Sequence, residues 1–292
     1  MKRRRCDSPT LCRGTILQTF FLEDEKMRRL LILLLVLGAA SMASAITDSW
    51  VSGGTDDWGT GTNWSLGHVP YNGALNATGY ADPLNEEAKI TCASGAGPVI
   101  EVGDVVSAYR VFVAATGNGE LTINGGTLLT NGYMTSSYTA GYNAVVNMLS
   151  GNVQIGFTGG TNGHWYLGRY GATIFNMSGG NFTIMNDLNL GQYASGSGTI
   201  NLSGGTLTAT TLKKTGTAHI DITGSGKLVF IGDKTAIVST WSTNGWLTSG
   251  TENFLDVGTA TFDGVKTTLV VPEPATLCLL GIGALSLIRR KR

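Results

Sequence analysis

Apolar and polar residues alternate along five short segments between residues 120 and 230. These segments read "ELTINGGTLL", "VVNMLSGNVQI", "IFNMSGGNFTI", "TINLSGGTLTA" and "HIDITGSGKLVF", and they begin at Glu120, Val145, Ile174, Thr199 and His219. A period of two residues predicts β-strands with one face turned to a core. The predicted inward residues are Val146, Met148, Phe175, Met177, Ile200, Leu202, Ile220 and Ile222.

A glycine turn interrupts each segment at a similar place. The glycines are Gly126, Gly151, Gly180, Gly205 and Gly226, which lie 25, 29, 25 and 21 residues apart. Strand, glycine turn, strand and loop, repeated at this length, are typical of a single-stranded parallel β-helix. Five such coils would form a rod of roughly 24 Å. Hairpins of a β-sandwich or β-roll are the alternative, but like residues recur at like positions and favour a solenoid.

The segments that flank the repeats of residues 105–232 lack the period. Residues 46–104 contain Trp50, Trp58 and Trp64, and we expect them to form an N-terminal cap over the exposed sheet edge. Residues 233–271 predict a closing β segment, with an Asp263-Gly264 turn between two strands.

The N-terminal region predicts export. Residues 27–45, "MRRLLILLLVLGAASMASA", contain a basic start, an apolar stretch and the small residues Ala43 and Ala45, as in a signal peptide cut after Ala45. An N-terminal membrane anchor is the alternative. Residues 1–26 show no such pattern, so we interpret them as a mis-annotated extension, with translation starting at Met27.

Composition narrows the function classes. The chain has 42 glycines in 292 residues and only 14% charged residues, which suits a β protein rich in turns. Residues 46–271 carry 8 basic and 15 acidic side chains, a net charge of −7. This acidic body argues against a nucleic-acid partner. Cys92 is the one cysteine of the body, so no disulfide is expected within it.

No enzyme motif stands out, and we expect no catalytic residue, cofactor or metal ion. The three histidines lack metal-ligand spacing, and "TGSGKL" at residues 223–228 is an incomplete P-loop that reads as strand, turn and strand. A polysaccharide lyase would need clustered carboxylates and a base, for which Asp187 and Arg169 are isolated candidates. Asp82, Glu86 and Glu87 are candidates for a weak surface ion site, although a solvated loop explains them as well.

Two sets of residues suggest carbohydrate binding. Asn147, Asn176, Asn201 and Asp221 would form an outward ladder, either binding sugar hydroxyls or stacking on one another to support the sheet. Tyr142, Tyr170 and Tyr193 recur in connecting turns, where they would either offer rings for stacking on sugars or stack on one another between coils. The three tryptophans would form a binding module if they were exposed on one flat face, and a cap if they were buried.

The chain ends with "VPEPATLCLLGIGALSLIRRKR". Residues 275–288 are mostly apolar and would form a helix of about 21 Å, which is short for a membrane span. Pro272 and Pro274 stand before this helix, and the basic cluster Arg289, Arg290, Lys291 and Arg292 would hold its end on the cytoplasmic side.

The order Pro272-Glu273-Pro274, apolar span and basic cluster resembles the PEP-CTERM sorting signal of exported bacterial proteins. The resemblance covers about the last 22 residues. It implies recognition by an exosortase, a membrane protease-transpeptidase that cuts near the Pro-Glu-Pro motif, and an association with exopolysaccharide or biofilm production. The body is similar, more weakly, to repeat regions of autotransporter passengers.

Together these features predict an all-β solenoid that is exported, held in the inner membrane by its tail, and sorted to the cell surface or extracellular matrix. Its expected role is structural or adhesive and not enzymatic. Its expected partners are signal peptidase and the general secretion machinery, an exosortase, and exopolysaccharide. A polysaccharide lyase or a carbohydrate-binding module is the alternative.

Overall fold

Two mainly parallel β-sheets form the body of the protein. The computed structural model describes residues 46–71, 86–157 and 162–272. The seven-stranded sheet contains, in this order, β1 (Ile46–Ser49), β2 (Glu86–Ile90), β5 (Arg110–Val113), β7 (Met134–Ser136), β9 (Trp165–Leu167), β12 (Asp187–Leu190) and β15 (Thr211–Lys214). The fourteen-stranded sheet contains β3 (Val99–Glu101), β4 (Val105–Ala108), β6 (Gly119–Thr130), β8 (Ala144–Ile155), β10 (Ala172–Met177), β11 (Asn181–Ile184), β13 (Ser197–Leu202), β14 (Thr206–Ala209), β16 (Thr217–Ile222), β17 (Lys227–Ile231), β18 (Leu247–Ser249), β19 (Glu252–Asn253), β20 (Thr259–Phe262) and β21 (Lys266–Val270).

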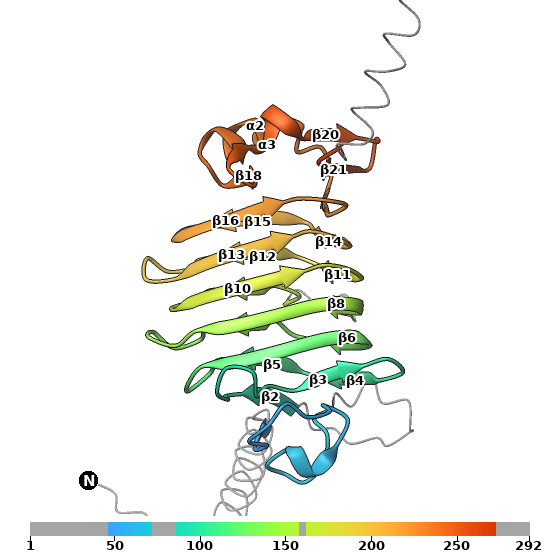
Figure 1. The fold of residues 1–292 in the computed structure, drawn as a ribbon, viewed down its shortest axis with the longest axis vertical. Coiled ribbons are helices and arrows are strands. Elements are labelled where there is room, and N and C mark those ends of the chain that lie inside the picture. The colour runs from blue at the N-terminus through green and yellow to red at the C-terminus, as the bar shows by residue number, and fades with distance from the viewer. Residues whose placement is uncertain (1–45, 72–85, 158–161, 273–292) are drawn as a thin grey trace, which may run out of the picture. The chain divides into compact units, whose positions relative to one another are not determined.

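The chain winds alternately through the two sheets, so the body is a parallel β-solenoid of about six turns (Figure 1). In one turn, β10 and β11 lie on either side of a glycine turn in the larger sheet, and β12 follows in the smaller sheet. Each strand pairs in parallel with its counterpart one turn away. Asn176, for example, lies between Asn147 and Asn201, and Asn201 lies opposite Asp221.

The fold class predicted from the sequence is confirmed, with one more turn than the five repeats suggested. The additional turn is N-terminal and contains β2, β3 and β4. The solenoid therefore begins before residue 105. This turn has the sequence "VIEVGDVVSA" in the larger sheet, where Glu101 and Asp104 flank the turn in place of the glycine pairs of later turns.

Apolar side chains fill the space between the sheets. The eight inward residues predicted from the sequence are all buried. Aromatic rings occupy the middle turns, where Trp165 stacks on Phe182 with 4.5 Å between ring centroids and meets the edge of Phe175 at 4.8 Å. Such alternation buries one side of every strand and leaves the other side for polar groups.

The glycine turns are set by close contact between neighbouring coils. Gly151 has φ of +94°, and a Cβ atom there would clash with the backbone of Gly125 and Gly126. Gly180 in turn lies against Gly151. These glycines are therefore required both by their backbone conformation and by the spacing of the coils.

Each end of the solenoid has a cover. At the N-terminal end, Trp58 and Trp64 lie on either side of the short 3-10 helix η1 (Gly61–Asn63) in the chain, and Trp50 pairs with Trp64; all three are buried. Their rings pack edge to face, at 5.3 Å for Trp50 and Trp64 and 4.7 Å for Trp58 and Trp64. Buried tryptophan rings are what the sequence analysis expected of a cap, whereas a binding module would have exposed them.

The C-terminal cover contains helices that the sequence analysis missed. Helix α2 (Thr235–Thr243) buries Val238 and Trp241, and the short α3 (Phe254–Val257) buries Phe254. The predicted closing pair is present: β20 and β21 are antiparallel and are joined through the turn at Asp263-Gly264. Strand β21 also pairs in antiparallel fashion with β17, which ends the parallel stacking.

The predicted signal peptide and most of the predicted sorting tail lie outside the described residues. This includes Ala43, Ala45, the extension 1–26 and residues 273–292. Among the residues that the structure describes, no helix has the length and apolar character needed to cross a membrane.

Candidate functional site

Tyrosine and arginine side chains collect on the outer face of the seven-stranded sheet and next to the ends of its strands. We call this the aromatic face; its members are Tyr109, Arg110, Phe112, Tyr133, Tyr138, Tyr166, Arg169, Tyr170 and Tyr193. Phe112 alternates with the inward residues Val111 and Val113, so it points outward. It is nevertheless buried, because Tyr133 and Tyr138 cover it edge to face at 5.8 and 5.4 Å.

Arg169 occupies the centre of this face. Its guanidinium carbon lies 5.0 Å from the ring centroid of Tyr138, 5.2 Å from Tyr166, 5.6 Å from Tyr170 and 5.8 Å from Tyr193. Rings at this distance attract a cation through their quadrupoles. The four tyrosines therefore hold a positive charge at the surface.

Arg110 repeats the arrangement two coils away. It lies over Tyr109 at 4.6 Å and Tyr133 at 4.5 Å, and its Nη1 pairs with Glu87 at 3.0 Å. Burial raises the pKa of the Tyr133 hydroxyl, and nearby Arg110 partly offsets this rise. Tyr133 is therefore neutral at physiological pH and presents a hydroxyl donor beside a fixed guanidinium.

Tyr170 and Tyr193 form the most parallel pair on the face. Their ring centroids are 4.2 Å apart with 5° between planes, and 40% of Tyr193 is exposed. A hydrogen bond between the two hydroxyl groups raises the pKa of Tyr170 and lowers the pKa of Tyr193, which Arg169 lowers further. The stacked rings and the guanidinium of Arg169 thus form one interacting group.

The aromatic face also differs in charge from the rest of the acidic body. Half of the eight basic residues between 46 and 271 lie on the outer side of this sheet or in the turn after it: Lys89, Arg110, Arg169 and Lys213. The acidic residues on the same side are Glu87 and Asp187. Asp187 pairs with Lys213 at 2.6 Å and His164 at 3.3 Å.

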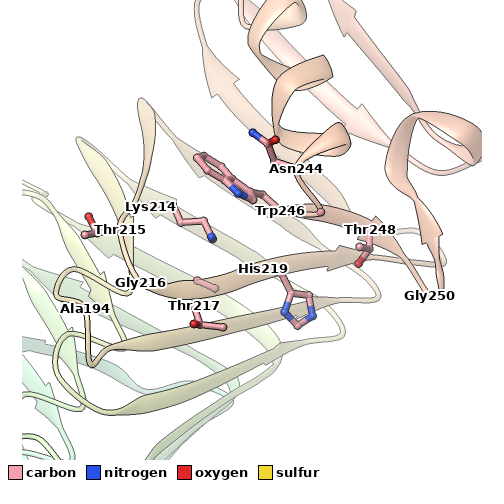
Figure 2. Close-up of a pocket in the computed structure, with 12 residues that line it drawn as sticks. Ala194, Lys214, Thr215, Gly216, Thr217, His219, Asn244, Trp246, Thr248 and Gly250 are labelled. Atoms are coloured by element: carbon pink, nitrogen blue, oxygen red, sulfur yellow. The ribbon is translucent and has the colours of Figure 1, made fainter.

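A second candidate site is an open cleft of about 640 Å³ between the last coil and the C-terminal cover. Figure 2 shows Lys214, His219 and Trp246 along it. The Lys214 ammonium lies 4.7 Å from the Trp246 ring centroid. The cleft offers an aromatic ring, a cation and hydroxyl groups from Thr217 and Thr248, but no carboxylate lines it.

The predicted asparagine ladder is present and bonds to itself. Asn147 Nδ2 donates to Glu120 Oε1 at 3.1 Å, Asn176 donates to Asn147 at 2.9 Å, and Asn201 donates to Asn176 at 2.8 Å. Of the two uses weighed for these residues, this geometry matches support of the sheet. Asp221 instead accepts from Thr248 Oγ1 and from the Gly250 N–H, at 3.1 and 2.7 Å.

Two of the three tyrosines named from the sequence lie together in the structure. Tyr170 and Tyr193 belong to the aromatic face, but Tyr142 packs against the core. One coil earlier, Tyr138 meets Tyr170 edge to face at 6.4 Å. Tyr109, Tyr133 and Tyr166 were also missed, although "YM" and "WYL" at the smaller sheet's strands were available as a signal.

Asp187 and Arg169, the two residues considered for lyase catalysis, do not lie side by side. Asp187 lies at the start of β12, whereas Arg169 follows the end of the neighbouring strand β9. His164, in register beside Asp187, precedes Arg169 by five residues, or roughly 16 Å of extended chain. The incomplete P-loop is the turn between β16 and β17, as its sequence indicated.

Glu86 and Glu87, named with Asp82 either as a weak ion site or as part of a solvated loop, point to opposite sides of strand β2. Glu86 is 2% exposed on the inner side of β2, and Glu87 pairs with Arg110 on the outer side. Asp82 lies outside the described residues.

Comparison with known proteins adds one match. Residues 270–292 match the PEP-CTERM protein-sorting motif. The comparisons with curated proteins and with solved structures gave no match. The chain thus carries a PEP-CTERM sorting signal behind a β-solenoid body, and this signal implies an exported protein that an exosortase processes at the membrane.

Proposed function

We propose that the protein is a structural and adhesive component of the cell envelope or its exopolysaccharide matrix, without enzymatic activity. The aromatic face carries this proposal, because Arg169 is fixed among four tyrosines at the surface. Tyrosine rings stack on sugar rings and their hydroxyl groups bond to sugar hydroxyls. Arginine binds carboxylate groups in a bidentate manner. The face therefore suits a polysaccharide that contains uronic acids.

The charge distribution supports an anionic ligand at this face. The body is acidic as a whole, yet basic side chains outnumber acidic ones on the outer side of the seven-stranded sheet. An acidic polymer would be repelled elsewhere and steered here. Repetition of tyrosines over successive coils also suits a linear polymer better than a single small molecule.

The non-enzymatic part of the proposal rests on the described polar groups. Asp187 is engaged by Lys213 and His164, and the asparagines of the ladder bond to one another. In the described ranges, these groups do not form the cluster of carboxylates and a base that a lyase requires.

Affinity electrophoresis of the full chain through gels containing alginate tests the proposal. We expect alginate, a polyuronate, to retard the chain and neutral dextran to leave its mobility unchanged. Arg169→Gln and Tyr193→Ala should each weaken retardation about tenfold or more. Lys227→Gln removes a positive charge from the other sheet and serves as the control. Equal retardation of all variants, or retardation by dextran alone, would exclude the aromatic face as an acidic-polysaccharide site.

The cleft at Trp246 favours a carbohydrate-binding function at a second place. Its ring and the neighbouring Lys214 resemble the aromatic face in chemistry. If Trp246→Ala abolishes retardation while Tyr193→Ala does not, binding belongs to the cleft.

A further inference from the structure

Two carboxylates are buried side by side at the N-terminal end of the solenoid. Asp48 is 0% exposed and Glu86 is 2% exposed. Strands β1 and β2 pair in parallel with Ile46 opposite Glu86 and Asp48 opposite Ala88, so both carboxylates lie on the inner side of the sheet. A buried carboxylate is costly unless a cation or several hydrogen-bond donors compensate its charge.

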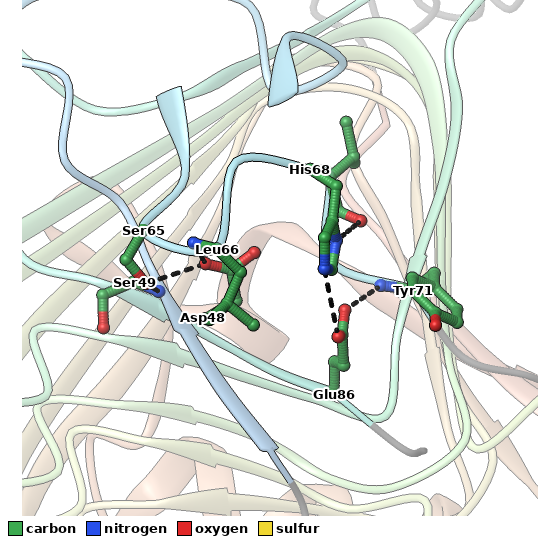
Figure 3. Close-up of polar contacts among 8 residues, drawn as sticks. Asp48, Ser49, Ser65, Leu66, His68, Tyr71 and Glu86 are labelled. Atoms are coloured by element: carbon green, nitrogen blue, oxygen red, sulfur yellow. Dashed lines mark hydrogen bonds and ion pairs between the residues drawn. The ribbon is translucent and has the colours of Figure 1, made fainter. Parts of the chain in front are cut away.

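A histidine from the cap meets these carboxylates. His68 follows η1, and its Nε2 atom lies 3.6 Å from Glu86 Oε1. One ligand atom from each of Asp48, His68 and Glu86 lies within 4.8 Å of the other two. Figure 3 shows the imidazole above Glu86, with Asp48 to one side.

Asp48 provides an independent sign of a ligand. Its Oδ1 atom accepts hydrogen bonds from Ser65 Oγ and the Leu66 N–H, both at 2.9 Å. Its Oδ2 atom is buried and has no hydrogen-bond partner among the described residues. Buried polar atoms almost always have a hydrogen-bond partner or a ligand, so the missing partner of Asp48 Oδ2 points to a ligand at this place.

Neighbouring backbone groups orient the other two side chains. His68 Nδ1 lies 3.2 Å from the Val69 carbonyl, which only accepts hydrogen bonds, so Nε2 is the ring nitrogen that faces Glu86. The Tyr71 N–H donates to Glu86 Oε2 at 3.2 Å. Metal-binding histidines and carboxylates are typically held by such outer hydrogen bonds.

We propose that Asp48, His68 and Glu86 bind a divalent transition-metal ion, with Zn²⁺ as the best match. Imidazole with two carboxylates suits zinc and similar ions, whereas calcium prefers oxygen ligands alone. Zinc bonds of about 2.0–2.2 Å require the three ligand atoms to move closer together. Nearly half of the His68 side chain is exposed, so it has room to do so. The ion would join the cap to the first strands of the solenoid.

Zinc titration of the full chain by isothermal calorimetry, together with thermal unfolding, tests this assignment. We expect His68→Ala and Asp48→Asn each to weaken binding of one Zn²⁺ equivalent by about 100-fold or more. Zinc should raise the unfolding temperature of the unmodified chain but not of these variants. Ser65→Ala, which removes one outer hydrogen bond, should weaken binding about tenfold.

His164→Ala is the matched control, because His164 also lies beside a carboxylate, Asp187, but outside this cluster. It should bind zinc like the unmodified chain. His68 is exposed, so His68→Ala should fold even if Asp48→Asn does not, which circular dichroism will show. The proposal is overturned if the chain binds no zinc, or if His68→Ala binds it unchanged. Calcium stabilisation that survives His68→Ala would also overturn it.

Discussion

The side-chain amide of Asn176 donates a hydrogen bond to Asn147 Oδ1 at 2.9 Å, across neighbouring coils of the solenoid. Its own Oδ1 accepts from Asn201 at 2.8 Å, so one side chain joins three coils. All the bonds of this ladder run in one direction, toward Glu120, a carboxylate that only accepts. Asp221 also only accepts, which is why it bonds to the C-terminal cover and does not extend the ladder.

Asn176→Ala should destabilise the body more than Asn181→Ala. Asn176 takes part in two ladder bonds, whereas Asn181 donates one bond of 3.2 Å to Asn152. At about 1 kcal/mol for each net hydrogen bond, the expected losses in free energy of unfolding are about 2 and 1 kcal/mol. Chemical denaturation of both variants measures the difference. Equal losses of unfolding free energy in the two variants would mean that the ladder stabilises the body no more than the exposed Asn181–Asn152 pair does.

The alternating pattern was sufficient to predict the ladder and the core. Val146, Asn147 and Met148 occupy the faces that a period of two assigned to them. The N-terminal turn was harder to recognise, because its single glycine, Gly103, stands between polar and apolar residues, in the order Glu101, Val102, Gly103 and Asp104. Stacking on β6 determines this turn, and that contact is not visible in the local sequence.

The aromatic face was recognised only in part because a serine replaces a glycine. Gly168 and Gly191 have φ of +70° and +57° two residues before Tyr170 and Tyr193, and Ser137 takes the same conformation, at +53°, one residue before Tyr138. Without the glycine, the sequence "SSYTAG" did not align with "LGRYG", and Tyr142 was chosen instead. The proposed zinc site was missed because Asp48, His68 and Glu86 span 38 positions of the chain. Pairing of β1 with β2 and the position of the cap bring them together.

Comparing Gly151→Ala with Gly141→Ala should separate the two requirements for glycine, a positive φ and close contact between neighbouring coils. Both residues have positive φ, at +94° and +86°. A Cβ atom at Gly141 meets nothing within 4 Å, whereas at Gly151 it would approach Gly125 C to 2.9 Å. We expect Gly141→Ala to cost about 1–2 kcal/mol of unfolding free energy from backbone strain alone. Gly151→Ala should cost about 3 kcal/mol or more, because neighbouring backbone must also move. Denaturant titration compares them, and similar costs would show that coil contact is unimportant.

Trp58→Ala should open the N-terminal cover. Trp58 is fully buried, and its carbonyl accepts a hydrogen bond from Trp64 Nε1 at 2.9 Å. Losing a buried aromatic side chain typically costs about 3–5 kcal/mol. An exposed sheet edge also promotes association, so light scattering should detect larger particles. Val51→Ala, at an exposed position in the same segment, is the control and should remain unchanged. A monomeric, fully stable Trp58→Ala chain would contradict the capping role.

Tyr193 should ionise at a lower pH than Tyr170. The interaction with the Tyr170 hydroxyl and the neighbouring Arg169 lower the pKa of Tyr193, and the interaction between the two hydroxyl groups raises the pKa of Tyr170. Because the pKa of Tyr193 is lowered in the folded state, its ionisation increases the free energy of unfolding as pH rises through this pKa. Because the pKa of Tyr170 is raised, the stability that its protonated form adds is lost as pH rises through the folded pKa of Tyr170. Ultraviolet titration should therefore show an early tyrosinate component that Tyr193→Phe removes. Arg169→Gln should shift this component toward the ordinary value of about 10. An unchanged titration in Tyr193→Phe would assign the early component to another tyrosine.

The mature protein should end before Arg292. The PEP-CTERM match at residues 270–292 implies exosortase processing, and we expect the cut to lie near the Pro-Glu-Pro motif, Pro272-Glu273-Pro274. Mass spectrometry of the surface-displayed chain should find a new C-terminus near this motif in cells that contain the exosortase. Deleting the exosortase gene should restore the intact tail in the membrane fraction. Arg292 retained on the displayed protein would refute processing, although membrane anchoring by residues 275–288 would remain compatible with it.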